Sequence, residues 1–197
     1  NNTSDVYVDA SELTATITSV SGGNFEKINV GTATAKATVT DTETPVTVNL
    51  SASTVNEDAI DTSYVFTATL SAASQGVTTI VTDKGTITIA DGQTTGTLTI
   101  ASNNTSDVYV DASELTATIT SASGGNFEKI NVGTATAKAT VTDTETPVTV
   151  NLSASTVNED AIDTSYVFTA TLSAASQGVT TIVTDKGTIT IADGQTT

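Results

Sequence analysis

The chain has 197 residues and a formal net charge of −16, from 22 acidic and 6 basic residues, and it contains no His, Cys, Met or Trp. These absences exclude a Ser-His-Asp triad, a thiolate nucleophile, a disulfide scaffold and the usual His/Cys zinc site, so we expect no enzyme. The negative charge would repel phosphate, and no apolar run is long enough to span a membrane. Binding to nucleic acid and direct membrane insertion are therefore not expected.

The chain is a tandem repeat. Residues 1–95 and 103–197 have the same sequence at an offset of 102, with one difference, Val20 against Ala122. A unit of this size should have its own core, and identical copies act by their number rather than through a single site.

Each of the two prolines follows a Val-Thr-Asp-Thr-Glu-Thr run and marks a joint between copies. We therefore expect three pieces: 1–43, the C-terminal part of a repeat; 44–145, a complete repeat; and 146–197, the N-terminal part of the next. Half a sandwich exposes its core and strand edges. The terminal half-domains are thus expected to pair with another copy of the chain, or the chain is a window of a longer array. The other expected partners are neighbouring repeats of the same chain.

The complete repeat contains seven runs in which apolar residues alternate with Thr or another polar residue, the period of half-buried strands. Thr and Val favour the pleated surface, and no helical periodicity lasts more than a turn. The expected strands cover residues 46–50, 64–70, 78–83, 86–89, 97–100, 114–119 and 134–141. About seven short strands in about 100 residues predict an all-β, immunoglobulin-like β-sandwich without the Cys-Trp-Cys core of antibody domains.

Acidic residues concentrate in loops that should meet. Strands alternate in direction, so every second loop falls at the same end of the sandwich. At the end where the last strand finishes we expect Glu57, Asp58, Asp83, Asp107, Asp111, Asp143 and Glu145. Their equivalents in the partial copies are Asp5, Asp9, Asp41, Glu43, Glu159, Asp160 and Asp185.

Such a cluster needs a counter-charge. Carboxylates within ~5 Å of one another repel by ~3 kcal/mol per pair at an effective dielectric of ~20, against a domain stability of roughly 5–15 kcal/mol. The cluster is stable if it is spread out in water, protonated or filled with a cation, and each acid taken singly is equally well explained as a solubilising charge. Oxygen-only ligands in flexible loops favour Ca²⁺ over Mg²⁺ or a transition metal.

The repeat resembles the Calx-β family. The matching features are Glu57, the run Gly-Thr-Ile-Thr-Ile-Ala-Asp-Gly-Gln at 85–93, the acidic loop at 107–114, and the last strand from Gly133 to Asp143. The resemblance implies calcium ligands at Glu57, Asp83, Asp107, Asp111, Asp143 and Glu145. The family often closes its last strand with consecutive Asp residues, whereas here the closing acids alternate with Thr.

Near-identical, acidic, Cys-free copies rich in Thr, Ala and Val are also similar to the extender region of giant bacterial RTX adhesins. This family is exported by type I secretion and includes a Marinomonas ice-binding adhesin. The resemblance implies an extracellular stalk at the bacterial cell surface, stiffened by Ca²⁺ at its joints and projecting a distal ligand-binding region.

Two other functions stay open at this point. The outward Thr ladders 116/118/120 and 134/136/140 are similar to the flat arrays of ice binders, so the repeat could be a module that binds ice or glycan. A calcium-sensing interaction domain is the other alternative, although a sensor does not need many identical copies.

Overall fold

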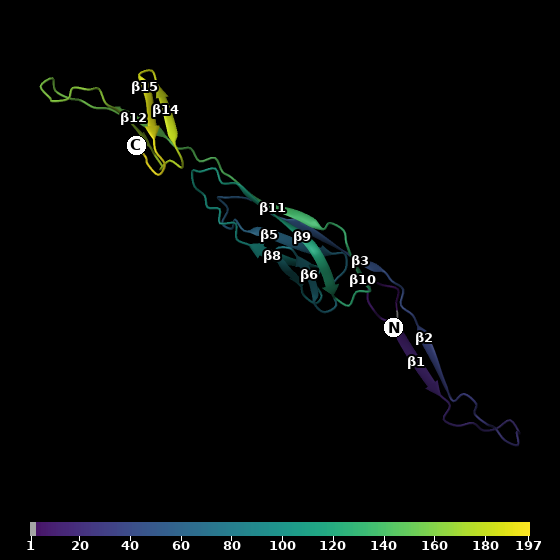
Figure 1. The fold of residues 1–197 in the computed structure, drawn as a ribbon. Coiled ribbons are helices and arrows are strands. Elements are labelled where there is room, and N and C mark those ends of the chain that lie inside the picture. The colour runs from purple at the N-terminus through teal and green to yellow at the C-terminus, as the bar shows by residue number, and fades with distance from the viewer. Residues whose placement is uncertain (1–2) are drawn as a thin grey trace. The chain divides into compact units, whose positions relative to one another are not determined.

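The computed structural model describes residues 3–197, and within that range the chain is all-β, with 15 strands and no helix (Figure 1). The same residues accordingly contain no helix long and apolar enough to cross a membrane. The chain divides into two compact units, which are described separately. The first comprises Asn1–Thr54, Ser63–Ala101 and Glu114–Thr140, and the second comprises Val55–Thr62, Ser102–Ser113 and Val141–Thr197.

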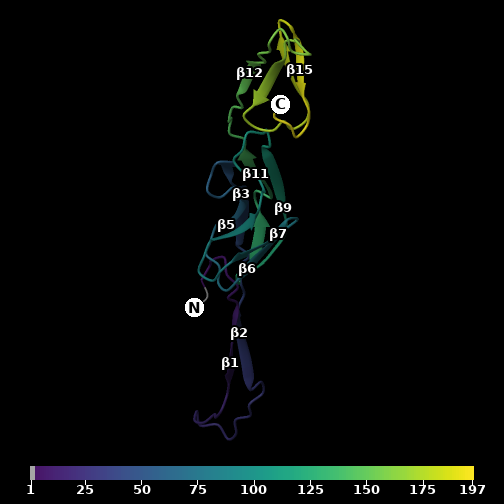
Figure 2. The same ribbon diagram turned by 90° about the vertical axis from the view of Figure 1, so that its left-hand side faces the viewer.

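The expected complete repeat forms two sheets, and both views show them as the layers of a sandwich (Figures 1 and 2). The four-stranded sheet has the order β10 (Lys129–Val132), β3 (Pro45–Ala52), β5 (Tyr64–Leu70), β8 (Thr95–Ile100). The five-stranded sheet has the order β4 (Thr54–Asn56), β11 (Thr136–Thr142), β9 (Ser113–Gly124), β6 (Thr78–Thr82), β7 (Gly85–Ile89). The expected immunoglobulin-like β-sandwich is confirmed.

The core between the sheets is built by every second residue of the strands, as the pleat requires. From the four-stranded sheet come Val46, Val48, Leu50, Phe66, Ala68 and Leu70. From the five-stranded sheet come Ile80, Ile87, Ile89, Ala117, Ile119, Ala139 and Val141. Ala117 of β9, Ala139 of β11 and Phe66 of β5 are all fully buried.

The seven expected strands correspond to β3, β5, β6, β7, β8, β9 and β11. Two short strands, β4 and β10, were not expected. β10 pairs in parallel with the first half of β3, and its sequence Lys-Ile-Asn-Val shows too little alternation to identify it.

The partial copies form smaller sheets. At the N-terminal side, β1 (Ser11–Thr16) pairs antiparallel with β2 (Thr34–Val39). At the C-terminal side, β12 (Val150–Ala154) pairs with β13 (Phe168–Leu172), and β14 (Thr180–Thr184) pairs with β15 (Gly187–Ile191).

Segments with identical sequence differ in secondary structure between the copies, depending on whether a partner strand lies beside them. Residues 147–149 are not in a strand. Their equivalents, residues 45–47, begin β3, and there they pair with β10. Residues 27–30 match β10 but have no β3 equivalent beside them in the first piece, and they form no strand. Pairing across the repeat, rather than local preference, therefore decides these elements.

Candidate metal centre and repeat joint

Glu57 is the buried acid of the expected cluster. It follows β4 directly, and its backbone N–H donates to the Thr142 carbonyl at 3.0 Å, which fixes it beside the end of β11. The side chain is only 2% exposed. One carboxylate oxygen, Oε1, accepts a hydrogen bond from the Thr144 N–H at 3.2 Å, while the buried Oε2 has no hydrogen-bond partner. A buried carboxylate oxygen without a partner is costly and calls for an explanation.

Asp111 and Asp143 lie against Glu57. Carboxylate oxygens of the three residues lie within 4.8 Å of one another. Asp143 follows the last residue of β11, and Asp111 stands two residues before β9. We call Glu57, Asp111 and Asp143 the acidic trio. It joins residues far apart in sequence within the second unit, as the alternation of strand directions predicts.

The loop carrying Asp111 is held by a buried amide. Asn104 Nδ2 donates to the Asp111 carbonyl at 2.6 Å, and its Oδ1 accepts a hydrogen bond from the Ser113 hydroxyl at 2.8 Å. The Thr62 hydroxyl donates to the Asn104 carbonyl at 3.0 Å. Asn104 thus ties this loop to the segment that follows Glu57.

The three carboxylates of the trio lie close enough to affect one another's charge. Burial raises the pKa of Glu57 above its ordinary value, the Thr144 N–H opposes this, and the neighbouring carboxylates of Asp111 and Asp143 raise it further. The arrangement therefore disfavours three full charges, and it offers only oxygen donors, one of them buried. Oxygen donors at this spacing suit a hard cation such as Ca²⁺.

The other expected ligands make different contacts. The Asp83 carboxylate accepts from the Thr118 N–H at 2.7 Å and pairs with Lys84 at 3.0 Å, and these two contacts lower its pKa. Asp107 accepts from the Tyr109 N–H at 2.6 Å. Asp58 and Glu145 are exposed, and Glu145 lines a hollow with Asp143.

The equivalent acids in the partial copies do not form a trio of this kind among the described residues. Asp5 accepts from the Tyr7 N–H, and Asp41 accepts from the Asp9 N–H. Glu43 pairs with Lys129, Asp185 pairs with Lys186, and Glu159 and Asp160 are exposed.

The joint between the first piece and the complete repeat is a bonded interface inside the first unit. Tyr7 stacks on Phe127 with ring centroids 5.5 Å apart, and its hydroxyl donates to the Ala73 carbonyl at 2.7 Å. The Val8 N–H donates to the Asn126 carbonyl, and the Glu128 N–H donates to the Val6 carbonyl. These bonds form a short antiparallel bridge between the two copies.

Glu128 brings a carboxylate into this joint. It accepts a hydrogen bond from the Thr44 N–H. That bond lowers its pKa, yet burial and the carboxylates of Asp41 and Asp5 leave the pKa raised overall. Its Oε1 is buried without a hydrogen-bond partner. The joint therefore also places acids of two copies side by side.

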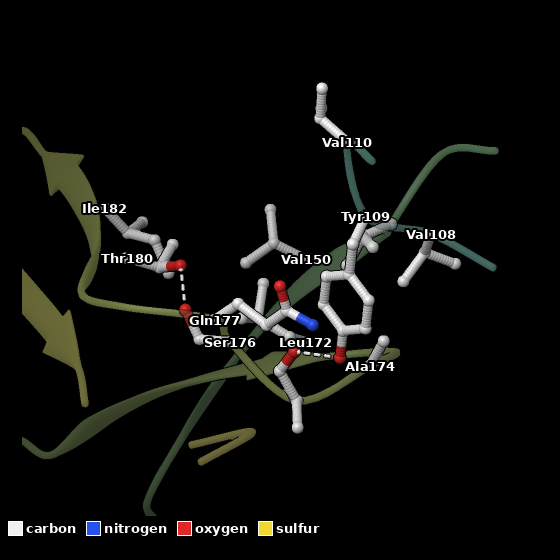
Figure 3. A pocket seen from close by; sticks show the side chains of 12 residues that line it. Val108, Tyr109, Val110, Val150, Leu172, Ala174, Ser176, Gln177, Thr180 and Ile182 are labelled. Carbon is white, nitrogen blue, oxygen red and sulfur yellow. Dashed lines mark hydrogen bonds between the residues drawn. The ribbon is translucent and has the colours of Figure 1, made fainter. Parts of the chain in front are cut away.

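The same contact recurs one repeat later, in the second unit. The Tyr109 hydroxyl donates to the Ala175 carbonyl at 2.7 Å, the same pair at an offset of 102 (Figure 3). Tyr109 also lines an open groove of about 520 Å³.

A family model, the LapA domain, matches residues 1–42 and 44–144. The chain belongs to the LapA domain family. This family is adhesin-related, which makes the chain an adhesin-associated domain and implies a cell-surface or extracellular location. Comparisons of the LapA chain with curated proteins and with solved structures gave no match.

Sequence reasoning missed the joint residues of the LapA domain. Tyr7 and Tyr109 are the tyrosines between two aspartates in Asp-Val-Tyr-Val-Asp, and an aromatic residue flanked by valines within an acidic loop was the available signal. Asn104 is buried, and nothing in the local sequence marks it as such.

Proposed function

We propose that this LapA chain is part of the extender, or stalk, of a bacterial RTX adhesin exported by type I secretion. Its repeats hold a distal ligand-binding region away from the cell surface, and Ca²⁺ at the joints stiffens the array. The near-identity of the copies supports a spacer, because a spacer depends on length and not on a unique site.

The observation that carries the proposal is the buried Glu57 carboxylate: its Oε2 has no hydrogen-bond partner, and one of its oxygens lies within 4.8 Å of carboxylate oxygens of Asp111 and Asp143. Calcium takes six to eight oxygen ligands in flexible geometry, so the trio would supply part of its shell. A bound ion would neutralise the crowded carboxylates and fasten β4, the loop before β9 and the end of β11 to one point.

The joint supports stiffness in a second way. Tyr7, Phe127 and Ala73 connect two copies through ring stacking and a hydrogen bond, and Lys129 pairs with Glu43 at 2.7 Å. Because Asp143 is four residues before the joint proline at 147, an ion at the trio would also restrain the segment leading to the next copy.

The proposal is tested by melting the full chain in calcium and in EGTA. An ion that binds only the folded state, at a free concentration 100 times its Kd, stabilises the folded state by about 2.7 kcal/mol. For a repeat of 102 residues this raises Tm by roughly 10–20 °C. Glu57→Gln should lose most of this rise, whereas Glu26→Gln, the same change at an exposed glutamate, should keep it.

Small-angle scattering tests the mechanical part. EGTA should shorten the particle of the unaltered chain, because unliganded acids repel and the joints bend. A wild-type chain whose Tm and maximum dimension are the same in calcium and in EGTA would refute the calcium-stiffened stalk.

A further inference from the structure

The loop between β8 and β9 takes part in two contacts that lie two residues apart. Asp111 belongs to the acidic trio, with a carboxylate oxygen within 4.8 Å of carboxylate oxygens of Glu57 and Asp143. Tyr109 donates its hydroxyl to the carbonyl of Ala175, a residue of the next copy of the repeat. One short loop therefore connects the proposed ion site of a repeat to the repeat that follows it.

Hydrogen bonds fix the shape of this loop at both contacts. The Asp107 carboxylate accepts from the Tyr109 N–H at 2.6 Å, which sets the turn that presents the tyrosine. The buried Asn104 donates from Nδ2 to the Asp111 carbonyl at 2.6 Å, and its Oδ1 accepts from the Ser113 hydroxyl at 2.8 Å. Hydrogen-bond networks of this kind carry energetic coupling between neighbouring sites.

The carbonyl that accepts the tyrosine hydroxyl lies on a loop with its own buried polar bonds. Ser176 follows Ala175 and is buried, and its hydroxyl shares a hydrogen bond with the Thr180 hydroxyl at 2.5 Å (Figure 3). The Gly178 N–H donates to the Asp193 carboxylate at 2.8 Å. Because a satisfied buried network makes a loop rigid, the Ala175 carbonyl is a fixed acceptor.

The same contact, with the same supporting bonds, is present one repeat earlier in the first unit. The Tyr7 hydroxyl donates to the Ala73 carbonyl at 2.7 Å, and the Asp5 carboxylate accepts from the Tyr7 N–H at 2.8 Å. Ser74 is buried and shares a hydrogen bond with the Thr78 hydroxyl at 2.6 Å. Two joints in separate units have this contact, so the contact is a property of the repeat.

We propose that Tyr109 is a positioning residue of the joint, through which an ion bound at the acidic trio orders the docking of the next repeat; this rests on the calcium site proposed above. An ion bound to Asp111 would hold the loop in the shape that places the Tyr109 hydroxyl against Ala175. The ion also restrains the linker after Asp143, and the tyrosine adds a second restraint on the repeat beyond it. Two restraints on one joint oppose rotations that a single restraint permits.

This coupling must act in both directions. If the ion strengthens the docking contact, docking strengthens ion binding by the same factor. Tyr109→Phe keeps the aromatic ring and removes only the hydroxyl that reaches Ala175. Although Tyr109 is not a member of the trio, this variant should bind calcium about two- to fivefold more weakly, which is the size of effect that one net hydrogen bond allows.

The first measurement is calorimetric titration of the full chain with calcium chloride. Glu57→Gln identifies the part of the titration that belongs to the trio, because it removes the buried carboxylate. Ser176→Ala loosens the acceptor loop in the next copy and leaves the loop of Asp111 unaltered, so it should weaken calcium binding in the same direction as Tyr109→Phe. The matched control is Tyr166→Phe, at a side chain that is 90% exposed, and it should leave calcium binding unchanged.

The second measurement follows the joint itself. The chain contains no cysteine, so Thr97→Cys and Thr188→Cys, both at exposed positions, allow one spin label on the complete repeat and one on the next copy. Pulsed electron paramagnetic resonance then gives the distribution of distances between the labels. Calcium should narrow this distribution in the otherwise unaltered chain and should narrow it less in Tyr109→Phe, whereas Tyr166→Phe should keep the full narrowing.

Different results would overturn the coupling alone or the calcium site as well. If the unaltered chain binds no calcium, or Glu57→Gln binds calcium as the unaltered chain does, the proposed site fails and the coupling fails with it. The coupling alone is overturned if Tyr109→Phe has an unchanged Kd and widens the distance distribution equally in calcium and in EGTA. It is also overturned if Tyr166→Phe weakens calcium binding as much, or if Ser176→Ala leaves calcium binding unchanged, because the effect of Tyr109→Phe would then arise within its own loop.

Discussion

The repeat contains its own control for a core substitution. Phe66 and Phe168 have the same sequence context, but Phe66 is fully buried in the sandwich and Phe168 is 46% exposed. Phe66 belongs to the face of β5 whose residues are buried in the core. Phe66→Ala removes this side chain and leaves a cavity, which costs about 3–5 kcal/mol. This is a large share of a domain's total stability of roughly 5–15 kcal/mol.

The assay is thermal unfolding of the full chain at low concentration, with urea unfolding as a second measure. A loss of this size should lower the Tm of the complete repeat by at least about 12 °C, since about 1 kcal/mol moves the Tm of a domain this small by about 4–8 °C. Phe168→Ala should move the same transition by less than about 2 °C. Equal losses from the two variants would refute the assignment of the core to the complete repeat.

Three further outcomes are expected. Tyr7→Phe removes one hydrogen bond across the joint and should cost about 1 kcal/mol by urea unfolding, while Tyr166→Phe, at an exposed side chain, should cost nothing. In EGTA, the raised pKa of Glu57 makes the folded repeat more stable below pH 4.5, the ordinary pKa of a glutamate, and this stability is lost as the pH rises through the raised pKa. Glu57→Gln should abolish this part of the dependence of stability on pH. Gly124→Ala would place Cβ 2.3 Å from a backbone carbonyl oxygen and should destabilise by about 1–3 kcal/mol more than Gly22→Ala, which has the same φ of 93° and open space.

Most of the sandwich could be predicted because its strands carry their own signal. Alternation of apolar residues with Thr located seven of the strands, and their inward residues form the core. The two strands that were missed depend on partners. β4 has three residues, and β10 is a strand only where β3 lies beside it. Local sequence carries little information about such elements, because residues 27–30 match β10 and form no strand.

The sequence predicted where the candidate site lies, but it predicted only in part which acids form it. Strand direction brings Glu57, Asp111 and Asp143 together, as the sequence predicts. Whether any of the fourteen expected acids binds calcium stays a prediction. Asp83 illustrates the difficulty. It directly follows a strand, as Asp143 does, but its carboxylate already forms an ion pair with Lys84 and accepts a hydrogen bond from the Thr118 N–H. Those partners are set by the pairing of sheets and are not visible in the spacing of acids.

The acidic trio and the core both form only when the front part and the back part of a repeat come together. Glu57 comes from the front part of the repeat, while Asp111 and Asp143 come from its back part, as do β9 and β11. In the C-terminal piece Glu159 is exposed, and in the N-terminal piece Asp41 lies beside Glu128 of the following copy and not beside a glutamate of its own repeat. A cation bound by the trio would therefore bind only to a completed sandwich, and linkage requires that it stabilise completion. In a LapA array, calcium would then act on the folding of each repeat and on the stiffness of each joint through the same three carboxylates.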